Sequence, residues 1–390
     1  MRSDAIMAAT RHTGRIRSID TMRGLVMLLM LIDHSRERFF LHHNVSDPMD
    51  IQHTDPALFW TRISAHLCAP VFVFLTGLSA WLYAHPASGP RSPAGFLVQR
   101  GLLLIGLEVT VLAALWFSLA QTIYLQVIWA IGLCMLVLAA VHRLPRHWLL
   151  ATGLLLVGGH NLLTPIQFEP GQWGYSLWTI LHDRGYWLRS DWINIKVSYP
   201  LLPWIGVILL GYSCGPLFGR DCQPSQRLRW LLQLGAGCLA LLVVLRGSNV
   251  YGETRPWQPQ DSLGLTLMDM ANFTKYPPSL DFLLLTLGLM FLLLALFERL
   301  RGFHNSRVEA VLVNFGSAPM FFYILHLYAL WLALAVSTSV TGTHTAEQLG
   351  IHSIQQVWLI AAGMAVLLYF PTRWFGRLKQ QHRHPWLKLF

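Results

Sequence analysis

The chain has 390 residues, of which 54% are hydrophobic and only 12% are charged, about half the charged share of an ordinary soluble domain. This composition excludes a soluble globular enzyme, a disordered protein and a secreted disulfide scaffold. The formal charge is +10, but no basic run is interleaved with aromatic residues, so nucleic acid is not expected as a partner.

Several stretches of about 20 residues are apolar enough to form membrane-spanning helices. They run at roughly 18–38, 57–84, 96–117, 121–141, 147–164, 199–218, 229–246, 278–298, 310–337 and 353–375. The sequence therefore predicts an all-α, polytopic membrane helix bundle of about ten helices over residues 18–375. A basic N-terminal segment, 1–17, precedes this domain and a basic tail, 376–390, follows it.

Lys and Arg are distributed unevenly between the loops on the two sides of the predicted bundle. One side holds 20 of them and the other holds 9. The positive-inside rule then places both termini in the cytoplasm, and the protein in the plasma (inner) membrane. The outer side carries 13 carboxylates. Its three long loops, about 39–56, 165–198 and 247–277, are where binding residues are expected.

The first predicted helix has Asp20 and Arg23 near its cytoplasmic end and the pair Asp33 and His34 near its outer end. Ionisable groups inside a bilayer are costly, so the default interpretation of this pair is a functional site. A neutral imidazole can take a proton from an amine or a hydroxyl. The alternative is that the helix ends at Ile32 and that the pair lies in water.

Later segments add polar groups at similar depths. Arg62 and His66 share a helical face in the second predicted helix, and His326 lies near the midplane of the ninth. Glu108, deep in the third, needs a partner or a proton. Before the eighth helix, Lys275 and an open helix N-terminus would attract an anion, although a capped helix with a solvated lysine is the alternative.

The loop at 39–56 contains a mixture of histidines and carboxylates. Its members are His42, His43, Asp47, Asp50, His53 and Asp55. Their spacing matches no zinc motif, so no metal is expected.

Several motifs in order resemble the heparan-alpha-glucosaminide N-acetyltransferase catalytic domain family, and more closely its bacterial branch. They are SIDTMRG at 18–24 followed by Asp33-His34, APVFVFLTG at 69–77, TKYPPS at 274–279 and FGSAPMFFYILH at 315–326. The resemblance implies a membrane acyltransferase that delivers the acetyl group of cytoplasmic acetyl-CoA to a sugar amine on the far side. It also implies a catalytic histidine in the loop after the first helix, for which His53 is the nearest counterpart. His34 stands where the family has an asparagine that helps to hold the acetyl group.

The leading hypothesis is acetyl transfer from acetyl-CoA to an amine or hydroxyl of an envelope glycan on the outer face. His34 oriented by Asp33, or His53, or His66 would deprotonate the acceptor. Substrate or oxyanion binding would fall to three further residues, Arg62, Lys275 and His326. Arg23 and Asp20 would bind the CoA end.

Two other function classes remain open. One is a proton-coupled transporter or export protein, in which the intramembrane Asp, Glu and His residues would relay protons. The other is a membrane scaffold without chemistry. The expected partners are the lipid bilayer and the glycan acceptor, and the small-residue face at Gly77-x-x-Ala80 is compatible with a homodimer.

Overall fold

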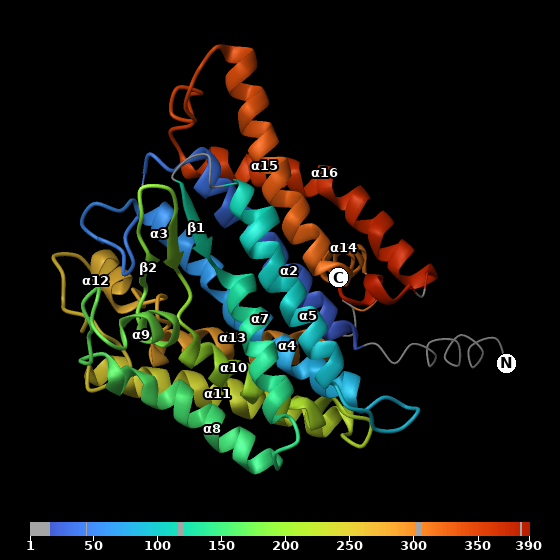
Figure 1. Ribbon diagram of the computed structural model, residues 1–390. Coiled ribbons are helices and arrows are strands. Elements are labelled where there is room, and N and C mark those ends of the chain that lie inside the picture. The colour runs from blue at the N-terminus through green and yellow to red at the C-terminus, as the bar shows by residue number, and fades with distance from the viewer. Residues whose placement is uncertain (1–15, 44, 116–120, 301–303, 305, 383) are drawn as a thin grey trace.

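The computed structural model describes residues 16–390 apart from 44, 116–120, 301–303, 305 and 383, and the described chain is mostly helical (Figure 1). Residues 1–15 of the predicted N-terminal segment lie outside the described part. In chain order the elements are α2 (Arg17–Phe39), α3 (Pro56–Ser64), η1 (Ala65–Leu67), α4 (Cys68–Ala84), α5 (Ala94–Leu107), η2 (Glu108–Leu112), β1 (Thr122–Leu125), α7 (Val127–Val141), α8 (Arg146–Gly159), η3 (His160–Leu163), α9 (Tyr175–Leu181), β2 (Gly185–Leu188), β3 (Asn194–Val197), α10 (Leu201–Ser213), η4 (Gly215–Phe218), α11 (Pro224–Ser248), α12 (Leu263–Met270), α13 (Leu280–Arg299), α14 (Arg307–Ser317), α15 (Pro319–Thr341), α16 (Ile354–Gln381) and η5 (Pro385–Lys388).

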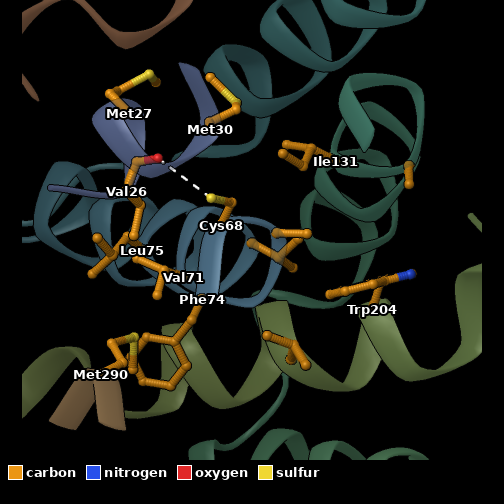
Figure 2. Packing of buried hydrophobic residues seen from close by; sticks show 14 of the residues in the cluster. Val26, Met27, Met30, Cys68, Val71, Phe74, Leu75, Ile131, Trp204 and Met290 are labelled. Atoms are coloured by element: carbon orange, nitrogen blue, oxygen red, sulfur yellow. Dashed lines mark hydrogen bonds between the residues drawn. The ribbon is translucent and has the colours of Figure 1, made fainter. Parts of the chain in front are cut away.

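The helix α2 lies in the middle of the bundle and contacts α4, α13, α14, α15 and α16 (Figure 1). The helices α4, α10 and α8 pack side by side, and α11 packs along α13. Figure 2 shows the core between these layers, where Met30, Phe74, Ile131 and Met290 come from four different helices. The apolar runs that predicted the bundle therefore form one continuous core.

Six of the described helical segments are long and apolar enough to cross a membrane. They are Pro56–Ala84, Ala94–Leu115, Pro224–Ser248, Leu280–Arg299, Pro319–Thr341 and Ile354–Gln381. The helices α7 and α10 are apolar but have only 15 and 13 residues. The chain is thus a helical membrane protein, whereas the count of ten spans and the positions of the termini stay predictions.

The chain is mostly helical, as predicted, but at one end of the bundle it also forms a small sheet, whose strand β2 contacts α9 (Figure 1). Its strand order is β1-β3-β2, with β1 parallel and β2 antiparallel to β3. The predicted helix at 121–141 therefore begins only at Val127, because Thr122–Leu125 pairs with β3. The sequence TIYL combines β-branched and aromatic residues, which favour a strand, but a hydropathy window does not distinguish a strand from a helix.

The predicted ninth helix, 310–337, is in fact two helices. The helix α14 ends at Ser317 and α15 begins at Pro319, with Ala318 at φ −136° and ψ 59° between them. A proline disfavours helical geometry in the preceding residue and suits the first position of a new helix. At the other end of the domain, α16 continues to Gln381, past the predicted limit at residue 375.

Two glycines allow α2 and α14 to touch backbone to backbone. A Cβ on Gly24 would lie 1.8 Å from the carbonyl oxygen of Leu312, and a Cβ on Gly316 would lie 1.9 Å from that of Asp20. Because the atoms in the way are backbone, no side-chain rotation could relieve the clash. Small residues at such contacts are how membrane helices pack closely.

Replacing Gly24 by alanine is expected to lower the free energy of unfolding by about 1–3 kcal/mol or more, the usual cost of overpacking. The measurement is thermal unfolding in detergent. The matched control is Gly106→Ala, because a Cβ at Gly106 would meet nothing within 4 Å. Gly106→Ala should be as stable as the wild type or slightly more stable. If Gly24→Ala were as stable as the wild type, the close contact between α2 and α14 would be contradicted.

Candidate functional site

A cavity of about 1330 Å³ lies between α2, α4, α5, α7 and α16. We call it the large cavity. Its charged lining residues are the basic Arg23, Arg100, Arg220, Arg227 and Lys379 and the acidic Asp20 and Asp221. Arg23 Nη1 lies 3.2 Å from Asp20 Oδ1, and its other terminal nitrogen donates to the Ser79 hydroxyl. The excess of basic residues suits a ligand that carries phosphates.

A second cavity, of about 630 Å³, lies against the other ends of α2 and α4. We call it the small cavity. Its charged, histidine and tyrosine lining residues are Asp33, His34, Arg36, Glu37, Asp47, Arg62, Tyr124, Arg184, Lys196, Tyr199, Lys275, Tyr276 and Tyr323. The lining therefore joins α2 and α3 to the hairpin of β2 and β3 and to the segment that precedes α13.

The two cavities meet at one level of the bundle. Four residues line both of them, namely Met30, Phe72, Val127 and Tyr323. These residues belong to α2, α4, α7 and α15, so each helix contributes one side chain to a shared junction. On α2 the large cavity extends toward Asp20 and the small cavity toward His34, in opposite directions from Met30. A chain-like ligand in the large cavity could therefore present its end to the small cavity.

His34 is paired with His326, which stands 292 residues away in the sequence. His34 Nδ1 lies 2.7 Å from His326 Nε2, and His326 Nδ1 lies 2.8 Å from the Phe322 carbonyl oxygen. A carbonyl only accepts, so His326 Nδ1 carries the hydrogen and, in the neutral ring, Nε2 accepts from His34 Nδ1. This leaves His34 Nε2 with a free lone pair. Glu37 Oε2 lies 3.9 Å from that nitrogen, beyond hydrogen-bond distance.

Asp33 is bound by two arginines and not by His34. Arg36 Nε lies 3.0 Å from its Oδ1, and Arg62 Nη1 lies 3.4 Å from the same oxygen. All three residues are buried. The predicted orientation of His34 by Asp33 is therefore wrong for the described geometry, because His326 makes that hydrogen bond. Asp33 instead neutralises two buried cations next to the small cavity.

Lys275 reaches the small cavity from the segment before α13 and is only 5% exposed. Its backbone amide donates to both carboxylate oxygens of Asp47, at 3.3 Å each, and its Nζ lies 5.2 Å from the centre of the Tyr276 ring. Burial raises the pKa of Asp47, although nearby cations oppose that shift. For Lys275, burial lowers the pKa, but Tyr276 and Asp33 outweigh it, so its pKa is raised and the amine stays charged.

Of the other predicted site residues, His326 is the partner of His34, whereas His53 and His66 lie outside the two cavities. His53 is 84% exposed in its side chain and binds Asp50 at 2.8 Å. His66 is buried against the Phe282 ring, and neither histidine lines the large or the small cavity. The structure thus brings together Asp33, His34, Arg62, Lys275 and His326, and it places Arg23 and Asp20 in the large cavity. Within the described part of the chain, no three His, Cys, Asp or Glu side chains are grouped to hold a metal.

Glu108 has its partner at the start of α7. Its Oε2 accepts a hydrogen bond of 3.1 Å from the backbone amide of Trp129, in the first turn of that helix. A carboxylate at a helix N-terminus is favourable because the first amides lack acceptors. Glu108 therefore holds the end of α7 that carries Val127 to the junction.

Sequence reasoning missed four residues that line the small cavity, namely Arg184, Lys196, Tyr199 and Tyr276. Lys196 reaches the cavity because β3 pairs with both β1 and β2, which places it opposite Tyr124 and Tyr186, and Tyr276 meets Tyr199 through their hydroxyls, 3.2 Å apart. In the segment NIKV at 194–197, polar residues alternate with β-branched residues, and this alternation was the sequence signal for the strand.

A comparison with protein families finds one that matches most of this helical core. Its model is described as "Heparan-alpha-glucosaminide N-acetyltransferase, catalytic" and matches residues 15–245, more than half of the chain. The match contains Asp20, Arg23, Asp33, His34 and Arg62, whereas Lys275 and His326 lie beyond its end. A comparison with curated proteins finds no match.

Proposed function

This chain belongs to the heparan-alpha-glucosaminide N-acetyltransferase catalytic family, a family of membrane acyltransferases, and on that basis we propose that it acetylates a glycan across the inner membrane. The donor is cytoplasmic acetyl-CoA, and the acceptor is an amine or hydroxyl of a glycan on the outer face. The proposal includes ten spans with both termini in the cytoplasm, as the distribution of Lys and Arg predicts.

The junction between the two cavities is the observation that carries this proposal. A transferase with its donor on one side and its acceptor on the other needs two binding sites that meet at the reacting atoms. Here Met30, Phe72, Val127 and Tyr323 line both cavities, and His34 lies one helical turn beyond Met30. A proton-coupled transporter does not require a basic cavity for a phosphate-bearing ligand, so the large cavity favours the transferase.

The large cavity is the proposed site of acetyl-CoA. Arg23, Arg100 and Arg220 would bind its phosphates, since guanidinium groups pair with phosphate oxygens through two hydrogen bonds. The thioester end would extend between the apolar side chains at the junction. The acceptor would occupy the small cavity, and its attacking atom would face His34 Nε2.

The proposed chemistry is a direct transfer with His34 as general base. His34 Nε2 takes the proton from the acceptor amine or hydroxyl while the acceptor nitrogen or oxygen attacks the thioester carbonyl. A tetrahedral oxyanion forms, and its collapse breaks the C–S bond. The CoA thiolate leaves and takes the proton from the His34 imidazolium, so the enzyme returns to its starting state. The hydrogen bond from His34 Nδ1 to His326 Nε2 holds the ring throughout, so Nε2 is the nitrogen that takes and returns the proton.

Stabilisation of the oxyanion falls to groups at the cavity junction. Tyr323 lines both cavities and carries a hydroxyl donor, and Lys275 supplies a positive charge in the small cavity. Arg62 lies in the same cavity, but its guanidinium is bound to Asp33. We therefore place Arg62 in the neutralisation of Asp33 and the hydrogen bond to the oxyanion with Tyr323, while Lys275 contributes its positive charge from the acceptor side.

Acetyl-CoA is expected to stabilise the purified protein against heat, by about 2.7 kcal/mol at a concentration one hundred times Kd. Arg23→Gln should weaken this binding by about tenfold, because a hydrogen bond between charged groups contributes about 1.5–3 kcal/mol. The control is Arg143→Gln, which removes a charge from an exposed residue outside both cavities. No stabilisation at saturating acetyl-CoA, together with proton-driven flux that is independent of CoA, would favour the transporter instead.

A further inference from the structure

The small cavity is basic even though the predicted outer side of the protein is acidic. Five basic residues line it, Arg36, Arg62, Arg184, Lys196 and Lys275, against the three acidic residues Asp33, Glu37 and Asp47. Two of the bases are accounted for by ion pairs, because Arg36 and Arg62 both bind Asp33 and Arg36 also contacts Glu37. The other basic residues are Arg184, Lys196 and Lys275, and the other acidic residue is Asp47, so these four carry a net positive charge.

These three cations are gathered around tyrosines rather than around carboxylates. The Arg184 guanidinium lies 4.8 Å and Lys275 Nζ lies 5.2 Å from the centre of the Tyr276 ring. Lys196 Nζ lies 5.1 Å from the centre of Tyr186, its partner across the strand pair. Among the described residues, the charged side-chain nitrogens of these three residues have no carboxylate oxygen within 4.0 Å, although Asp47 accepts from the backbone amide of Lys275.

Burial separates the roles of the three cations. Arg184 is exposed and Lys196 is half-buried, so both lie near the entrance, whereas Lys275 is 5% exposed and lies within the site. The Lys275 ammonium group is buried and charged but has no carboxylate oxygen in direct contact within the described part of the chain, so an anion that enters the cavity can pair with it directly. The hydroxyls of Tyr199 and Tyr276, 3.2 Å apart, add hydrogen-bond donors beside it. Together these groups form a site built to receive an anion.

We infer that the acceptor carries an anionic group, a carboxylate or a phosphate, which Lys275, Arg184 and Lys196 bind while the attacking amine or hydroxyl faces His34. This inference rests on the proposed function and names the class of its acceptor. The entrance cations attract the anion from solution, and Lys275 fixes it inside the cavity. The acceptor is thereby oriented by its charge, in addition to any contacts of the sugar ring.

Three amino sugars test the inference, because all of them carry the same free 2-amino group. They are glucosamine, muramic acid, which adds a carboxylate, and glucosamine 6-phosphate. With acetyl-CoA as donor, the KM of at least one anionic sugar should be about tenfold or more below that of glucosamine, as one charged hydrogen bond allows. The difference should shrink at high salt, since ions screen the attraction. A lower KM for muramic acid would indicate a site for a carboxylate, and a lower KM for glucosamine 6-phosphate would indicate a site for a phosphate.

Lys275→Met should reduce the preference for anionic over neutral acceptors by about tenfold, because it removes the buried charge and keeps a long side chain. The matched control is Arg189→Gln. Arg189 lies in the hairpin of β2 and β3, over the Tyr186 ring, but does not line the small cavity, so its loss should leave the preference unchanged. Equal KM values for all three sugars, or equal losses in the two variants, would overturn the inference while leaving acetyl transfer intact.

A binding measurement without acetyl-CoA separates this inference from the proposed function. Muramic acid and glucosamine 6-phosphate should protect the wild-type protein against heat more than glucosamine does, and Lys275→Met should remove that difference. If the anionic sugars bind in this way but no sugar is acetylated, the anion site stands and the acyltransferase proposal fails. If they protect no better than glucosamine, the inference is wrong.

Discussion

Replacing His34 by glutamine is expected to lower kcat for acetyl transfer by about 10²–10⁴-fold, the usual contribution of a general base. A glutamine amide can still donate to His326 Nε2, so the neighbouring histidine keeps its hydrogen bond. Protection by acetyl-CoA should be unchanged, because His34 does not line the large cavity. The measurement is the initial rate of acetylation with saturating acetyl-CoA.

The pH dependence of the same reaction gives a second sign of this role. His34 accepts a proton only when its ring is neutral, so the wild-type rate should fall as the pH decreases through the range in which imidazole becomes protonated. The residual rate of His34→Gln should lack this decrease, since glutamine does not titrate.

Matched histidine variants decide between the candidates that the sequence left open. His147→Gln is the control, because His147 is exposed on α8 and lines neither cavity. His53→Gln and His66→Gln test the other two candidate bases. A loss at either of them as large as that at His34, with full activity of His34→Gln, would contradict the mechanism proposed above.

Replacing Asp33 by asparagine is expected to lower the free energy of unfolding by about 3–5 kcal/mol, the cost of leaving a buried charge without its partner. The variant keeps the shape of the side chain but removes the charge that Arg36 and Arg62 share. The measurement is thermal unfolding in detergent, with the yield of folded protein as a second readout.

The control is Asp261→Asn, the same substitution at an exposed residue, which should change stability by less than about 0.5 kcal/mol. The double variant Asp33→Asn with Arg62→Met should recover part of the loss, since it removes one of the stranded cations while Arg36 still contacts Glu37. Losses that simply add in the double variant would show that the two residues are not coupled.

Much of the architecture was predictable, because crossing a bilayer imposes a local rule on the chain. A membrane helix needs an apolar run of sufficient length, and six described segments meet that rule within or close to their predicted ranges. The errors arose at features that hydropathy does not report, namely strand pairing and the start of a new helix. Thr122–Leu125 is apolar but pairs as a strand, and Pro319 begins a new helix inside an apolar run.

Part of the site was also visible in the sequence. Asp33, His34, Lys275 and His326 stand out because ionisable residues inside or beside apolar runs are costly and are therefore informative. Their partners were not visible. Nothing local relates His34 to His326, which is 292 residues away, and the sequence suggested Asp33 as the group that orients His34.

By itself, the sequence determined the class of the protein, the apolar segments of its bundle and most of the polar residues that need an explanation at membrane depth. Only the tertiary structure decided that His34 pairs with His326, that two cavities meet at Met30, Phe72, Val127 and Tyr323, and that the hairpin of β2 and β3 adds basic residues to the small cavity. The physical reason is that hydropathy acts on each segment separately. Pairing depends on contacts between distant backbones, such as that of Gly24 with Leu312, which no single segment encodes.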